Sequence, residues 1–208
     1  MSKQIKIFIP IFITILIITS YITPFIQTSN RISNDVFRLH ILANSDSEED
    51  QNLKLKVRDE ILKSSQTLFL NCKSLNEIID ISINNINFFK SIAEKCIKDN
   101  GYEYDVNVYV DKEYFNTRKY ERITLPSGIY NALKIEIGQA KGHNWWCVMF
   151  PAICLSAVSD EEIYEILDED EINLINSNEK YEIRFKIVEI YAKIKDELKK
   201  LRQWVNLN

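Results

Sequence analysis

The distribution of apolar residues separates an apolar N-terminal segment from a region of short alternating elements. Two lysines precede an uncharged run over residues 7–26, which contains prolines and a few hydroxyl residues. A transmembrane helix needs about 20 apolar residues, and the core of a signal peptide about 7 to 15. The length favours an anchor, whereas the prolines favour a signal peptide. Neither Ser20 nor Ser29 has a small residue two positions earlier, so no clean cleavage site is visible. Residues 1–29 are therefore predicted to be a signal peptide or an N-terminal membrane anchor, cleaved or retained.

A strand followed by two helices is predicted next. Residues 36–43 form a short apolar run with basic interruptions, which is typical of a strand, and the turn signal Asn44-Ser45-Asp46-Ser47 follows. Either of the last two turn residues can cap a helix, and apolar residues then repeat at helical spacing to about Asn71. Ser74 begins a second apolar stripe that ends at residues 99–101. We expect these two helices to form an antiparallel pair.

Alternation with a period of two predicts strands in the next part of the chain. Apolar and polar residues alternate over residues 102–110 and over residues 133–137, and a weaker strand is predicted over residues 119–125. A strand, two helices and then successive strands without intervening helices are typical of an α+β fold. We therefore predict an α+β domain over residues 36–157, with a small antiparallel or mixed sheet covered by the helical pair.

The C-terminal region is first acidic and then amphipathic. Residues 158–178 are rich in aspartate and glutamate, and we predict a short helix within an acidic connection. Residues 179–205 have apolar side chains three or four positions apart, which predicts an additional C-terminal amphipathic helix. Two interpretations stay open. This helix docks on the domain, or it binds a membrane surface or a partner through its apolar face.

Composition narrows the classes of function. The formal net charge is −4 and no basic block stands out, so nucleic-acid binding is not expected. The chain has no glycine-rich phosphate loop, so a doubly wound nucleotide-binding fold is not supported. Without the N-terminal segment about 180 residues remain, which is the size of one domain with an appendage.

Residues 141–154 concentrate two of the three tryptophans, two of the four cysteines and one of the two histidines. Cys147 and Cys154 flank a short stretch with a proline, so a chain reversal can bring them within bonding distance, and a disulfide is predicted. Two separately buried thiols are the alternative. In the proposed helical hairpin Cys72 and Cys96 lie about 30 Å apart, so they are predicted to be free or buried.

The same segment contains residue types for two reactive arrangements. A thiol nucleophile would pair Cys147 with His143, but in Cys/His hydrolases the two residues come from distant positions in the chain. A zinc site that adds His40 and Cys154 to this pair lacks the compact ligand spacing of structural zinc sites. We therefore expect no metal ligands and no catalytic residues.

The adjacent Trp145 and Trp146 point to opposite faces if the segment is extended. One ring then enters the core, and the other meets solvent or a partner, where a tryptophan makes a strong interface anchor. In the alternative, both rings are buried around the sheet edge.

Three motifs that occur in order resemble the stage II sporulation protein R family. They are residues 38–46 (RLHILANSD), residues 125–133 (LPSGIYNAL) and residues 138–147 (GQAKGHNWWC). The resemblance covers approximately residues 36–155. The family often has two prolines where this chain has Pro151-Ala152, and that difference concerns only the rigidity of the turn.

The resemblance implies an exported signalling protein of endospore formation that needs no cofactor. Members are made in the forespore and cross its membrane into the space between the forespore and mother-cell membranes. There they trigger a membrane-embedded aspartic protease, which matures the precursor of the mother-cell sigma factor. That protease is the expected partner, and the N-terminal segment is the expected membrane contact. The alternatives are an exported Cys/His hydrolase that acts on the cell wall and a structural scaffold between the two membranes.

The candidate partner-binding residues form two groups along the sequence. The first group is His143, Asn144, Trp145 and Trp146. The second group is His40 together with Asn44 to Asp46.

Overall fold

The computed structural model describes residues 3–120, 123–151 and 166–176, together with scattered helical residues between Lys186 and Leu198. The chain divides into two compact units. The first, which we call the sheet unit, comprises residues 33–115 and 129–169. The second, the helix unit, comprises residues 1–32, 116–128 and 170–208.

A four-stranded mixed sheet forms the centre of the sheet unit. Its strands, in spatial order, are β2 (Val106–Phe115), β5 (Gly128–Ile137), β1 (Phe37–Leu42) and β6 (Asn144–Phe150). Strand β1 runs parallel to β5, with Leu39 opposite Leu133, and antiparallel to β6, with Leu39 opposite Cys147. The predicted α+β fold is confirmed, and the sheet is mixed.

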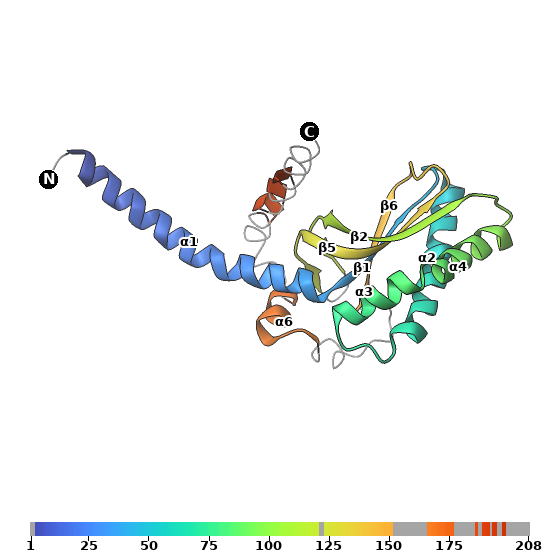
Figure 1. Cartoon of the computed structure of the whole chain (residues 1–208). Helices are drawn as coiled ribbons and strands as arrows, with labels where there is room; N and C mark the ends of the chain where they lie inside the picture. The colour runs from blue at the N-terminus through green and yellow to red at the C-terminus, as the bar shows by residue number, and fades with distance from the viewer. Residues whose placement is uncertain are drawn as a thin grey trace, which may run out of the picture. The chain divides into compact units, whose positions relative to one another are not determined.

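Three helices gather on one side of this sheet, as Figure 1 shows. They are α2 (Glu48–Phe69), α3 (Leu75–Asn84) and α4 (Ile86–Asp99). Alternate residues of a strand share one face, and Phe37, Leu39 and Ile41 of β1 join a buried apolar cluster with Val57 of α2 and Phe89 of α4. Each large apolar side chain buried in this way stabilises the fold by about 1.5 to 3 kcal/mol.

The second predicted helix is wrong in one respect, because it is divided at Asn85. This residue has φ −113° and ψ 21°, which are not helical angles. Its backbone N–H donates to the carbonyls of Ile81 and Ser82, and its side-chain amide donates to Ile81 O at 2.8 Å. A short polar side chain that bonds to nearby backbone carbonyls competes with helix continuation. The apolar stripe continues through α3 and α4, so periodicity alone did not reveal the break.

The strand boundaries also differ from the sequence prediction. Strand β2 begins at Val106 rather than at Tyr102 and extends to Phe115. Residues 119–125 do not form one strand, because the short strands β3 (Arg118–Lys119) and β4 (Thr124–Leu125) pair antiparallel as a hairpin. Strand β6 was not predicted as a separate strand, since its apolar run contains no alternation.

The helix unit includes α1 (Lys3–Asp35), the β3–β4 hairpin and α6 (Glu169–Ile175). Helix α1 is long and apolar enough to cross a membrane, and it continues past the predicted end of the N-terminal segment at residue 29. Helix α6 lies within the predicted acidic connection. The described residues between Lys186 and Leu198 are helical, and the rest of the predicted C-terminal helix over residues 179–205 lies outside the described residues.

Candidate partner-contact site

Two connections meet at one end of the sheet. One joins β1 to α2, and the other is the turn between β5 and β6. The backbone N–H of Gly142 donates to Ala43 O at 2.9 Å, and that of Lys141 donates to Asn44 O at 3.2 Å. These bonds join segments that lie about one hundred residues apart in the sequence, so this end of the sheet forms only in the folded chain.

Two glycines permit this close approach. Gly138 has φ +57°, a left-handed conformation that favours glycine, and a Cβ there would lie 2.3 Å from Asn44 Oδ1. At Gly142 the constraint is purely steric, because a Cβ would lie 2.1 Å from the backbone oxygen of Ser45. The β5–β6 turn therefore fits the β1–α2 connection only without side chains at these positions.

Polar side chains hold the β1–α2 connection in place. Asn44 accepts a hydrogen bond from the Gln139 N–H at 3.0 Å and donates to Asp50 Oδ2 at 2.8 Å. The Ser45 hydroxyl donates to the same carboxylate oxygen at 2.5 Å. Burial raises the pKa of Asp50, but hydrogen bonds from Ser45, Asn44 and Tyr104 outweigh burial and hold the pKa below its ordinary value. Asp50 is therefore a structural anion of the first turn of α2.

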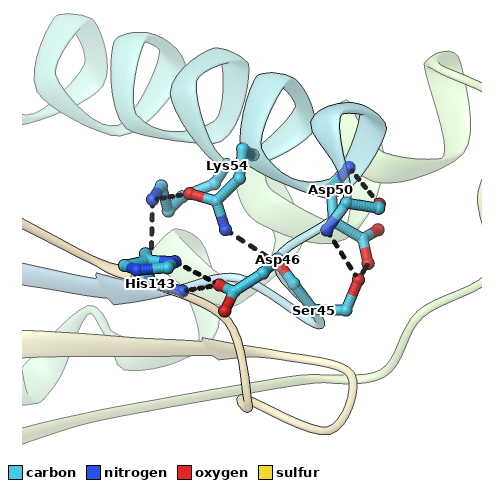
Figure 2. A network of polar contacts seen from close by, with 7 residues as sticks. Ser45, Asp46, Asp50, Lys54 and His143 are labelled. Atoms are coloured by element: carbon cyan, nitrogen blue, oxygen red, sulfur yellow. Dashed lines mark hydrogen bonds and ion pairs between the residues drawn. The ribbon is translucent and has the colours of Figure 1, made fainter.

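Asp46 and His143 face each other at the surface, as Figure 2 shows. Asp46 Oδ1 accepts the backbone N–H of His143 at 2.6 Å and also contacts the ring nitrogen Nδ1. The buried Lys54 ammonium donates to His143 O at 2.8 Å and to Gln51 Oε1 at 2.6 Å. The side chains of His143 and Asp46 remain 78% and 55% exposed. We call Asp46 and His143, with their supporting backbone, the loop patch.

The Lys54 ammonium lies beneath the loop patch. Burial, and to a lesser extent Arg58, hold the pKa of Lys54 below its ordinary value, and the nearby Asp46 carboxylate offsets this only in part. The ammonium therefore fixes the His143 carbonyl from below while Asp46 fixes its N–H. Both contacts use the backbone of His143. Asp46 is the residue that the imidazole itself contacts.

His40 lies apart from the loop patch, on the sheet face opposite the helices. Its Nδ1 is 2.5 Å from Glu113 Oε1, and its Nε2 is 2.5 Å from Asn144 Oδ1. The rings of Phe115 and Trp146 pack edge-on against the imidazole, with centroids 6.2 and 5.9 Å away. His40 is buried. The two sequence groups are therefore rearranged, since Asn44 and Asp46 join His143 whereas His40 joins Asn144 and Trp146.

The two tryptophans point to opposite sheet faces, as alternation predicted. Trp145 packs against the apolar core, and the Arg58 guanidinium lies 4.5 Å from its ring centroid. Trp146 is half-buried beside His40 and Phe115. Both rings are half-buried, but Trp145 packs on the core beneath the helices, whereas Trp146 lies on the opposite sheet face beside His40.

Three charged residues extend the His40 group across the sheet face. Lys134 Nζ lies 3.8 Å from Glu113 Oε2 and 3.5 Å from Glu136 Oε1. The Tyr109 hydroxyl donates to Glu136 at 2.8 Å. Burial opposes the charged form of Lys134, but contacts with Tyr109 and the two carboxylates raise its pKa above the ordinary value. Sequence reasoning missed Glu113, because His40 lies 73 residues away and no local pattern links the two.

The cysteines bear on the hydrolase alternative. Cys147 is disulfide-bonded and buried on the helix-covered face opposite Leu39, whereas Cys72 and Cys96 are free. Cys154 lies outside the described residues, so its pairing with Cys147 stays a prediction. A disulfide-bonded cysteine supplies no thiolate, and this gives no support to a Cys147 nucleophile. Among the described residues, no group of three or more His, Cys, Asp or Glu side chains is placed to hold a metal ion.

Comparison with known proteins gives one family. The model of the family described as stage II sporulation protein R matches residues 33–160, which include all four strands of the mixed sheet and helices α2, α3 and α4. The chain is 36% identical over 131 residues to stage II sporulation protein R of Bacillus subtilis (strain 168). That match covers 63% of this chain and 58% of the relative, so the chain spans a little over half of the relative's length. No solved structure matches the chain.

Proposed function

The chain belongs to the stage II sporulation protein R family, and from this premise we propose that it is an exported signal that activates a membrane-embedded aspartic protease. A role in sporulation follows from the family, and the apolar helix α1 fits a signal peptide or an anchor. The protein is made in the forespore and crosses the forespore membrane. Activation of the protease then leads to maturation of the mother-cell sigma-factor precursor.

The loop patch is the observation that best supports a binding role. Its imidazole and carboxylate are exposed, yet the backbone that presents them is fixed by Lys54 and by the two closely fitting glycines. A contact surface that is already ordered loses little conformational freedom when a partner binds. On this proposal the protein acts as a ligand and not as a catalyst.

Activation requires a difference in affinity between two states of the protease. A ligand that binds the active arrangement more tightly shifts the population toward it, and only by the amount of that difference. We assign this contact to His143 and Asp46 of the loop patch. The second sequence group comprised His40 and Asn44 to Asp46. Because His40 is buried, only Asn44 to Asp46 remain contact candidates from that group.

The test is cleavage of the sigma-factor precursor in cells that make the protease and the precursor, with and without this protein. His143→Ala is the informative variant, because the loop contacts at this position use its N–H and carbonyl, which the substitution keeps. We expect His143→Ala to reduce precursor cleavage at least about tenfold, which corresponds to about 1.4 kcal/mol of binding free energy.

The matched control is Lys90→Ala on α4, because the Lys90 side chain is partly exposed and pairs only with Glu94 among the contacts described. This control is expected to leave cleavage unchanged. Trp145→Ala is a poor probe of contact, because the ring packs on the core and its loss lowers stability. Equal cleavage with and without the protein would defeat the signalling proposal and favour a structural scaffold.

A further inference from the structure

We propose that α1 is a membrane anchor that stays attached to the working protein, rather than a signal peptide that is removed. The occupant of its apolar surface is the hydrocarbon core of a lipid bilayer. The inference deepens the proposed function, because it restricts the signal to the surface of the membrane that it has crossed. Its test does not depend on protease activation.

The first part of α1 is exposed and apolar on every side. Phe8 is 68% exposed, Leu16 is 50% exposed and Tyr21 is 69% exposed, and all the side chains from residue 8 to residue 21 are exposed. A helix that packs on a soluble protein has only one apolar stripe. A helix that is apolar all round and unburied instead suits a bilayer. Two lysines precede this segment, and positively charged residues stay on the cytoplasmic side of a membrane. The residues that follow the helix therefore lie on the opposite, non-cytoplasmic side.

Three threonine hydroxyl groups of α1 form hydrogen bonds within the helix. Thr14 donates to Pro10 O at 2.8 Å, Thr19 donates to Ile15 O at 2.9 Å, and Thr23 donates to Thr19 O at 2.7 Å. An unsatisfied polar group costs several kcal/mol in lipid, so internal bonding is required of a spanning helix. These three bonds make the exposed threonines compatible with a hydrocarbon environment. Prolines are likewise tolerated in transmembrane helices.

The last part of α1 has a different environment and belongs to the folded protein. Phe25, Ser29 and Ile32 recur at helical spacing on one face, and all three are buried, with Ile32 fully so. The Arg31 guanidinium lies 3.8 Å from Asp170 and 3.7 Å from Glu171 of α6. The C-terminal end of the apolar helix is therefore fixed by packing and by charge.

This arrangement bears directly on removal of the N-terminal segment. Proteolysis concentrates at exposed, poorly ordered segments, because the backbone must leave regular structure to be cut. Ser20 and Ser29 both lie within one continuous helix, which Figure 1 shows, and Ser29 is buried. Cleavage after Ser29 would also remove Phe25 and Ser29 from the folded protein. Only Val36 separates α1 from β1, so the anchor leads directly into the central sheet.

The experiment measures the N-terminus and the membrane attachment of the full-length chain made in a bacterial host. Intact mass spectrometry should find residue 1 or 2 as the N-terminus, and alkaline carbonate should leave the protein in the membrane pellet. Processing of one of the host's own secreted proteins in the same cells shows that its signal peptidase is active. A mature chain that begins at Tyr21 or Asn30 and is recovered in the supernatant would overturn the proposal.

Two variants identify the attached segment. Ile13→Glu combined with Leu16→Glu places charges in the exposed apolar part of α1, without touching a buried residue. This pair should move most of the protein from the carbonate pellet to the supernatant. Leu70→Glu, at an exposed apolar residue of the sheet unit, should leave the distribution unchanged. Retention of the double variant, or release of the Leu70 variant, would contradict anchoring by α1.

The two proposals can fail separately. If the protein is cleaved and released while precursor cleavage still depends on it, the anchor is wrong and the signalling role stands. If the protein is retained in the membrane while precursor cleavage is independent of it, the signalling role is wrong and the anchor stands.

Discussion

At the scale of single residues, the loop patch depends on positions where a side chain cannot fit. We predict that Gly142→Ala lowers the free energy of unfolding by about 3 kcal/mol, because its Cβ would overlap the backbone oxygen of Ser45. Gly101→Ala is the control. Its φ of +84° strains alanine by about 1 kcal/mol, but no atom lies within 4 Å of the added carbon. Thermal denaturation measures the stability of both variants. Equal losses of stability would show that the contact between Gly142 and Ser45 is not rigid.

A second prediction at this scale concerns Asp50, whose pKa lies below its ordinary value of 3.8. The folded state therefore favours the charged form, and this stabilisation is present above pH 4 and is lost as the pH falls below 3.8. Asp50→Asn should lower the free energy of unfolding by about 1 to 3 kcal/mol at pH 7. The difference from the parent protein should shrink as the pH falls from 5 toward 2.

The control for this pH series is Asp80→Asn, at an exposed carboxylate of α3. It should follow the parent protein throughout. Chemical denaturation at each pH gives the comparison. A difference between Asp50→Asn and the parent that stays constant from pH 7 to pH 2 would contradict the role of Asp50 as a structural anion.

At the scale of elements, two serine caps give a matched pair. Ser47 begins α2 and accepts the Asp50 N–H, and Ser74 begins α3 and accepts the Glu77 N–H. Replacement of either serine by alanine should cost about 1 kcal/mol, measured by thermal denaturation. Only Ser47→Ala should also reduce precursor cleavage, because the first turn of α2 supports the loop patch through Asp50. Equal effects of the two variants on precursor cleavage would contradict a role of the loop patch in signalling.

The elements also show where periodicity is a sufficient guide. The apolar run of β1 with its basic interruptions, and the helical repeats of α2 and of the stripe that begins at Ser74, predicted these elements, because the face that an element buries repeats along its own sequence. The break at Asn85 was missed, since one side-chain bond to Ile81 O decides it and leaves the apolar stripe intact. Strand β6 was missed for a related reason. Its residues from Cys147 onward are buried on both sides, so polar and apolar positions do not alternate.

At the scale of the whole molecule, the cysteines report on the oxidation state of the chain. Mass mapping without reductant should find the Cys147 peptide joined to the Cys154 peptide, as the sequence predicts. Cys72 and Cys96 should remain unpaired. Burial raises the pKa of both free thiols, so they should react slowly with alkylating reagents at pH 7. Alkylation of Cys147 in the unreduced, folded protein would contradict its disulfide state.

The sequence alone determined the family, the α+β class and the order of most elements. Motifs and periodic burial involve residues that are close together in the sequence, so they can be recognised without the tertiary structure. It also marked the residues of the loop patch as unusual. Tertiary structure decided how these residues group. His143 meets Asp46 across 97 positions, and His40 meets Glu113 across 73. Such pairs depend on strand register and on which sheet face a side chain occupies, and those follow from packing of the whole domain.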